Sequence, residues 1–153
     1  MDAGQLHAWS VSDSATFWSE LWDFAAVIGD KGTEPYITTG TRLEDTRFFP
    51  AARLNYAENA LRFANGNQEI VFWGENRVKT RISTRQLRMN VGAFQRVLRA
   101  ASVTQSDRVA AILPNLPEGI CALFTASSIG AIWSSCSPDF GTQGILDRFK
   151  QIE

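Results

Sequence analysis

Regular patterns of apolar residues run through the second half of the chain. Residues 69–74 form a short apolar run and residues 78–83 alternate apolar with polar side chains, which predicts a β-hairpin around Glu75 and Asn76. Residues 84–101 predict an amphipathic helix, because the apolar side chains recur on one side. Those side chains are Leu87, Val91, Phe94, Leu98 and Ala101.

A strand–helix–strand pattern follows. Residues 108–113 predict a strand that ends at Pro114, and residues 131–135 predict a second one. The helix predicted between them begins at Pro117, is ended by Gly130 and is apolar nearly all round, so we expect it to be buried on more than one side. This spacing is typical of a βαβ unit with parallel strands and a right-handed crossover, which places the chain in the α/β class.

The first part of the chain carries an aromatic stripe instead. A helix that Ser12 or Asp13 caps and Gly29 ends would align Phe17, Trp18, Leu21, Trp22, Ala25 and Ile28. We interpret the stripe as core packing in preference to a ligand box or a docking face, because large aromatic side chains dominate buried area. Residues 30–50 predict a loop and residues 55–64 a short helix.

Two regions are therefore expected. Residues 1–64 form an N-terminal helical region, and residues 65–153 begin an α/β domain with parallel βαβ units. That domain is expected to be incomplete, since residues 144–153 start an amphipathic helix without a terminator and a parallel sheet needs further neighbours.

Composition narrows the class of protein. With 44% hydrophobic and 20% charged residues in 153, the chain is globular, and its net charge of −1 argues against a nucleic-acid partner. Two cysteines and one histidine are too few for a disulfide framework or a structural zinc site.

The first residues lack a secretory pattern, so we expect a cytoplasmic location. Residues 119–138 carry no charge but many hydroxyls, which favours a buried helix and strand over a membrane span.

One basic feature stands out within this near-neutral chain. Four arginines, Arg85, Arg88, Arg96 and Arg99, lie on the polar side of the helix predicted over residues 84–101. They could bind phosphate or an acidic partner, but without interleaved aromatic residues we interpret them as a solvated face.

Catalytic motifs are absent from the sequence. It holds no phosphate-binding G-x-x-x-x-G-K-[ST] loop, no G-x-G-x-x-G and no G-x-S-x-G elbow. The single histidine, His7, is expected in a frayed and solvated terminus, which argues against a nucleophile–histidine pair. We therefore predict no catalytic residue.

The loop at residues 137–142 is the segment best placed for a ligand, because it follows the carboxyl end of a parallel strand. Asp139 could accept hydrogen bonds from a ligand hydroxyl or amine, or it could belong to a turn that caps the next helix. Both interpretations are open at this stage. Cys136 next to it is expected to be a buried thiol, since no base is available to activate it.

Several stretches resemble a known family. Residues 17–24 (Phe-Trp-Ser-Glu-Leu-Trp-Asp-Phe) and 48–61 resemble the N-terminal region of acyl-CoA synthetases. Residues 107–118 and 130–133 resemble the first strand–helix–strand of the adenylate-forming superfamily, to which those enzymes belong. Residues 133–141 (Trp-Ser-Ser-Cys-Ser-Pro-Asp-Phe-Gly) are most similar to the acetoacetyl-CoA synthetase branch.

This resemblance implies a function for a longer protein. Such enzymes use ATP and Mg²⁺ to convert a carboxylate into an acyl-adenylate and then transfer the acyl group to CoA. The chain would be the N-terminal part of an acetoacetate–CoA ligase, with an acetyl- or propionyl-CoA synthetase or a non-catalytic docking module as alternatives. The family's phosphate loop and adenylation lysine match nothing in the 153 residues, so the chain alone is expected to be inactive.

The resemblance also implies a binding site. In relatives, a Phe-Gly-Gly stretch after the second strand lines the CoA nucleotide pocket, and it aligns with Ser137, Pro138 and Asp139 here, next to Phe140. The expected CoA-binding residues are therefore Ser137, Pro138, Asp139 and Phe140.

Overall fold

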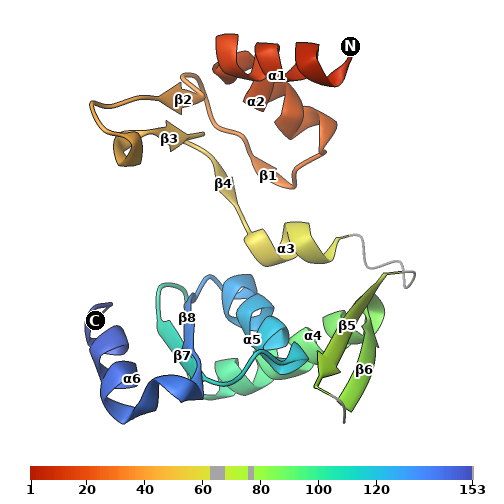
Figure 1. Cartoon of the computed structure of the whole chain (residues 1–153), viewed down its shortest axis with the longest axis vertical. Helices are drawn as coiled ribbons and strands as arrows, with labels where there is room; N and C mark the ends of the chain where they lie inside the picture. The colour runs from red at the N-terminus through yellow and green to blue at the C-terminus, as the bar shows by residue number, and fades with distance from the viewer. Residues whose placement is uncertain (63–67, 76–77, 153) are drawn as a thin grey trace. The chain divides into compact units, whose positions relative to one another are not determined.

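The structure is a computed structural model that describes residues 1–62, 68–75 and 78–152 (Figure 1). The chain divides into two compact units, Met1–Asn55 and Tyr56–Glu153, which are described in turn. The predicted boundary after residue 64, between the N-terminal helical region and the α/β domain, stays a prediction.

The first unit begins with two helices, α1 (Ala3–Ser12) and α2 (Ser14–Phe24). Asp2 and Gln5 cap α1 reciprocally through side chain and backbone, and the Asp13 carboxylate accepts the Thr16 N–H to cap α2. His7 is exposed but lies within α1, so the expectation of a frayed terminus was wrong.

Aromatic rings hold the first unit together. Trp9, Phe17, Trp18 and Phe48 form a chain of edge-to-face contacts with ring centroids 5.2–5.5 Å apart. A second set joins Trp22, Phe49 and Tyr36. These contacts show that the aromatic stripe packs, but none of its residues is fully buried, and Trp18 and Ile28 stay exposed. The helix ends at Phe24 rather than at Gly29, because the backbone already turns at Ala26, where φ is 48°.

The segment predicted as a loop contains short elements. Strand β1 (Gly29–Asp30) pairs antiparallel with β4 (Arg53–Leu54), and β2 (Ile37–Thr38) pairs with β3 (Arg47–Phe48). The short 3₁₀ helix η1 (Leu43–Asp45) lies between β2 and β3. Pairs of two residues leave no periodic signal in a sequence, which explains why the pattern did not predict them.

The second unit starts with α3 (Tyr56–Leu61) and the antiparallel strands β5 (Glu69–Gly74) and β6 (Val78–Ser83). These strands confirm the predicted hairpin, whose turn residue Asn76 lies outside the described residues, as do residues 63 and 64 of the helix predicted over 55–64. Helix α4 (Thr84–Ala100) follows at once, capped by the Ser83 hydroxyl, which accepts the Gln86 N–H.

A βαβ unit follows. Strands β7 (Arg108–Ile112) and β8 (Ile132–Cys136) are parallel, and α5 (Pro117–Ser128) connects them (Figure 1). This arrangement confirms the α/β class. A 3₁₀ turn, η2 (Pro138–Phe140), then leads into α6 (Gly141–Lys150), which begins three residues before its predicted start at Gly144.

Helix α5 is the centre of this unit, since it packs against α3, α4 and β8. Thr125 and Ala126 are fully buried within it, which confirms the prediction of burial on several sides. Leu87 and Val91 of α4 are buried as well. None of the described helices combines the length and apolar character that a membrane crossing needs.

Candidate functional site

The carboxyl ends of the two parallel strands define one edge of the second unit. The last paired residues are Ile112 and Cys136, and the Leu113 N–H donates to the Cys136 carbonyl oxygen at 3.2 Å. The segments that follow β7 and β8 therefore leave the sheet side by side. Crevices that bind ligands in α/β proteins lie at such an edge.

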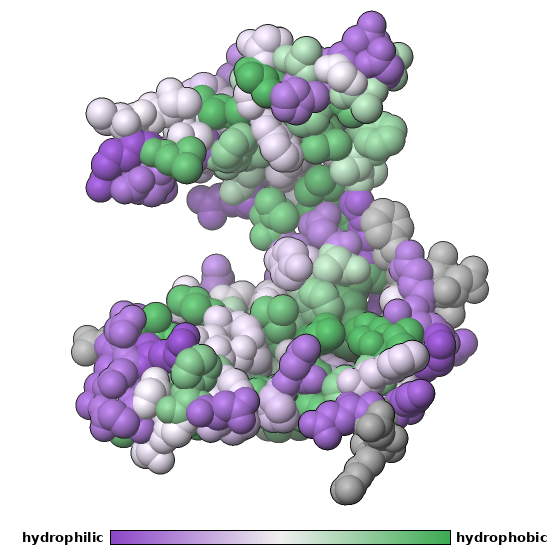
Figure 2. All heavy atoms as spheres, viewed as in Figure 1, coloured by the Kyte–Doolittle hydropathy of each residue, from purple (hydrophilic) through white to green (hydrophobic). Residues whose placement is uncertain are grey.

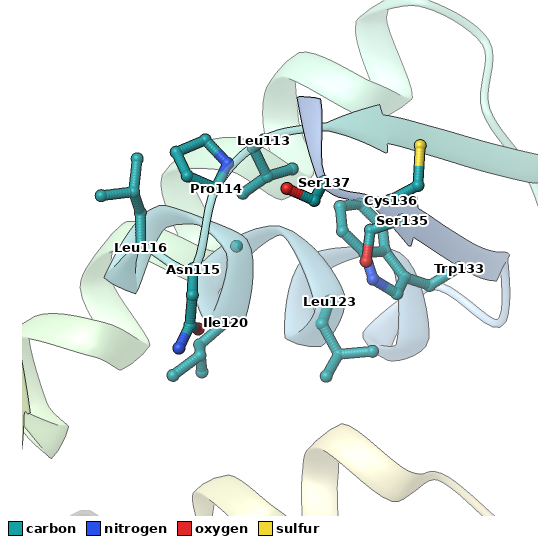
Figure 3. A pocket seen from close by; sticks show the side chains of 11 residues that line it. Leu113, Pro114, Asn115, Leu116, Ile120, Leu123, Trp133, Ser135, Cys136 and Ser137 are labelled. Carbon is teal, nitrogen blue, oxygen red and sulfur yellow. The ribbon is translucent and has the colours of Figure 1, made fainter. Parts of the chain in front are cut away.

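A crevice of about 370 Å³ lies between this edge and the start of α5. Its apolar wall comes from Leu113, Pro114, Leu116, Ile120, Leu123 and Trp133 (Figure 3). Its polar groups are the Asn115 amide and the hydroxyls of Ser135 and Ser137. An apolar wall with a few hydroxyl and amide groups suits a ligand arm that alternates methylene with amide groups.

Gly119 shapes the floor of this crevice. A Cβ atom at this position would lie 2.8 Å from Leu113 Cδ1, closer than non-bonded carbon atoms approach. The missing side chain therefore leaves room for the Leu113 side chain against the first turn of α5.

The four predicted site residues are divided by the structure. Ser137 lines the crevice, whereas Pro138, Asp139 and Phe140 form the exposed turn η2 next to it and are not among its lining residues. The Ser137 hydroxyl donates to Asp139 Oδ2 at 2.8 Å and accepts from the Asp139 N–H at 3.3 Å. A hydroxyl has one proton and two lone pairs, so Ser137 keeps one lone pair for another donor.

The interpretation of Asp139 as a helix cap was wrong. The residue that precedes α6 is Phe140, and no side chain accepts a hydrogen bond from the first turn of that helix. The Phe140 ring instead lies under the Arg148 guanidinium, whose central carbon is 3.9 Å from the ring centroid. This cation–π contact ties the turn to α6.

The two thiols do not form a reactive site. Burial raises the pKa of Cys121, the Glu118 carboxylate raises it further, and the Thr125 hydroxyl opposes them. Cys136 is buried, and its sulfur points away from the segment 113–116 (Figure 3). Within the described ranges, no group of three His, Cys, Asp or Glu side chains is arranged to hold a metal ion.

Sequence reasoning missed half of this site. It singled out the loop after β8 but not Leu113, Asn115 and Leu116 after β7, nor Trp133 within β8. The signal was available, since the carboxyl ends of parallel strands meet at one edge and a loop after either strand borders the same crevice.

Comparisons with known proteins agree on one family. The family model described as AMP-binding enzyme matches residues 57–153. The acetoacetyl-coenzyme A synthetase of Rhizobium meliloti is 48% identical over 151 residues, which are 99% of this chain and 23% of that protein. The acetoacetyl-CoA synthetase of Macaca fascicularis is 37% identical over 97% of this chain and 22% of its own length.

A solved structure is similar throughout. The acetoacetyl-CoA synthetase from Streptomyces lividans superposes with a TM-score of 0.86 and 34% identity, covering 100% of this chain and 24% of that one. The chain thus spans about a quarter of the length of the relatives it matches.

Proposed function

Because the chain belongs to the AMP-binding enzyme family, we propose that it forms the N-terminal part of an ATP-dependent acetoacetate–CoA ligase. The observation that carries this proposal is the 48% identity, over nearly the whole chain, to a protein named acetoacetyl-coenzyme A synthetase. The complete reaction joins acetoacetate to ATP as an acyl-adenylate, releases pyrophosphate, and transfers the acyl group to the CoA thiol with release of AMP.

In this proposal the chain contributes to CoA binding, at the crevice beside β8. The apolar wall around Trp133 fits the methylene groups of a pantetheine arm, and the free lone pair on Ser137 fits one of its amide N–H groups. Pro138, Asp139 and Phe140 form the outer rim of the same site. The family resemblance supports three of these positions, Ser137, Pro138 and Asp139.

ATP and Mg²⁺ are assigned to no residue of this chain. The sequence carries no Ser/Thr/Gly-rich phosphate loop, and the described residues hold no cluster of metal-ligating side chains. Their sites, and the acyl pocket that selects acetoacetate over acetate or propionate, belong to the rest of the proposed enzyme. A cytoplasmic location is part of the same proposal.

Pyrophosphate exchange into ATP tests the proposal. A purified longer protein, read from a frame that extends these 153 residues, should catalyse exchange with acetoacetate and form acetoacetyl-CoA, and acetate and propionate should be poorer substrates. The 153-residue chain should show no exchange above a buffer control. A preference for acetate would assign another acyl specificity, and a frame without a phosphate loop would favour a non-catalytic docking module.

A further inference from the structure

Helix α4 has a face made of arginines. Arg85, Arg88, Arg96 and Arg99 recur at spacings of three and eleven residues, which places them on one side of a helix. All four are exposed, and none forms an ion pair or a side-chain hydrogen bond with another described residue. We call these four residues the arginine face.

The arginine face belongs to a longer stretch of the sequence in which all charged side chains are positive. Residues 76–106 contain seven Lys and Arg residues and no Asp or Glu, although the whole chain has a net charge of −1. Like charges three residues apart on a helix repel each other, and Arg85 and Arg88 lie near the helix start, where the dipole already favours anions. The face therefore lowers the stability of α4, and no described carboxylate offsets that effect.

A glycine lies at the middle of the same face. Gly92 follows Arg88 by four residues and precedes Arg96 by four, in the interior of a helix, where glycine is among the least favourable residues. A Cβ atom at Gly92 would meet nothing within 4 Å. No described neighbour therefore requires glycine here, although the absence of a side chain leaves the helix backbone open to close approach.

From these features we propose that the arginine face binds an acidic α-helix of a partner protein, which crosses α4 at Gly92. The centres of the pairs Arg85–Arg88 and Arg96–Arg99 are about 16 Å apart along the axis, at 1.5 Å per residue. A partner helix with carboxylates three turns apart and a small residue between them meets both pairs while the two backbones approach at Gly92.

The same observations distinguish this partner from other anions. A solvated face accounts for the exposed arginines but gives no role to Gly92. A lipid headgroup layer is flat and gains nothing from a missing side chain in the middle of the face. Met89, which is 60% exposed and borders the face, offers an apolar contact at the crossing point.

Fluorescence anisotropy of a labelled peptide tests the proposal on the complete protein of which this chain is proposed to be the N-terminal part, because the isolated chain is expected to associate. The probe is an alanine-rich helix with two glutamate pairs spaced like the two arginine pairs, and the reference peptide carries glutamine in their place. We expect the acidic peptide to bind and R88Q/R96Q to weaken that binding roughly tenfold. K150Q, which removes one charge from α6, is the control and should bind as the unaltered protein does.

Substitution of Gly92 distinguishes a helix that packs against α4 from an acidic peptide that is held only by its charge. G92Q replaces glycine by a better helix former and should keep or raise the melting temperature while it weakens the acidic peptide several-fold. Equal binding of the glutamine peptide, or a G92Q protein that binds as tightly as before, would overturn the proposal. So would phosphatidylserine vesicles that bind more tightly than the peptide and are indifferent to G92Q, since they would assign the face to a lipid surface.

Discussion

At the scale of single residues, the hydrogen bonds of Ser137 restrict what the crevice can recognise. Its proton is engaged by Asp139 Oδ2 at 2.8 Å, so toward the crevice the hydroxyl can only accept. In the proposed ligase, that orientation favours an amide N–H of the pantetheine arm over a phosphate oxygen, which is itself an acceptor. Asp139 would then act through Ser137 as a positioning residue.

Replacement of Asp139 by alanine tests this role. We expect Asp139→Ala to raise the KM for CoA in the complete enzyme a few-fold to tenfold, since one hydrogen bond is worth about 0.5–1.5 kcal/mol. The rate of acetoacetate-dependent pyrophosphate exchange should stay nearly unchanged, because adenylate formation does not use CoA.

A double variant, in which Ser137 and Asp139 are both replaced by alanine, and a control variant complete that experiment. Asp139→Ala should add little to Ser137→Ala if the carboxylate acts through the hydroxyl. Asp147→Ala removes a carboxylate that is bonded to Gln143 on α6 and should leave the KM for CoA unchanged. An equal loss of exchange and thioester formation would show that the turn is only structural.

Asp107 makes the stability of the second unit depend on pH in the acidic range. Its carboxylate accepts the Thr104 N–H at 2.6 Å and the Thr104 hydroxyl at 2.9 Å, which lowers its pKa below the ordinary value of 3.8. A depressed pKa stabilises the fold above the unfolded value, and that contribution is lost as the pH falls through the folded value. In the complete protein, we expect Asp107→Asn to lower the melting temperature at neutral pH. Below pH 3.8 the melting temperature of the variant should fall less steeply than that of the unaltered protein. A titration of the Asp107 carboxyl by NMR that gives an unshifted pKa would contradict the assignment.

At the scale of elements, α4 has a buried and an exposed side whose contributions to stability differ. Leu87 is 4% exposed and packs in the α4–α5 contact, whereas Met89 is 60% exposed two residues later. In the complete protein, we expect Leu87→Ala to lower the free energy of unfolding of this unit by about 2–5 kcal/mol, or to abolish its cooperative transition. Met89→Ala should change it by less than about 0.5 kcal/mol, measured by urea denaturation of both variants. Similar losses in both would mean that α4 does not pack on α5 as described.

Periodicity explains which elements could be predicted. The hairpin, α4 and the βαβ unit repeat an apolar pattern over at least five residues, so their bounds follow the sequence within one or two positions. The start of α6 was displaced, because the chain re-enters a helix at Gly141, where φ is 64°. Helix α1 was missed because its one clear signal is the capping pair Asp2 and Gln5.

The candidate site was only half predictable, for a related reason. The turn after β8 was found from its place at a strand end, but its internal geometry was not, since Asp139 had two possible acceptor roles in the sequence. The choice between them depends on the Ser137 rotamer and on the contact of Phe140 with Arg148, which the hydrophobic pattern does not encode.

At the scale of the whole molecule, little apolar surface is fully buried. The buried hydrophobic residues among those described are Ala57, Leu87, Val91, Ala126, Ala131 and Cys136. Ile112 and Ile132 lie on the face of the two-stranded sheet opposite to Trp133, and more than half of each is exposed. Figure 2 shows hydrophobic atoms gathered between α5 and the hairpin, and mostly hydrophilic atoms over α6. Exposed patches of this kind drive association.

The isolated 153-residue chain should therefore associate. A net charge of −1 offers little repulsion, and each large apolar side chain left exposed forgoes about 1.5–3 kcal/mol of burial. We expect size-exclusion chromatography to show oligomers, ANS to bind, and melting to be broad. A sharp melt from a monomer that binds no ANS would show a self-sufficient unit and would favour the docking-module alternative.

The contact between α3 and α5 can form only after α5 has been synthesised. Ala57 of α3 is fully buried, and the ring centroids of Tyr56 in α3 and Phe124 in α5 are 6.0 Å apart. The ribosome adds Phe124 about 67 residues after Ala57. At ~5–20 residues per second, α3 waits roughly 3 to 13 s before its partner helix has even been translated. During that interval its apolar side is available to chaperones, and slow codons before residue 124 would lengthen the wait.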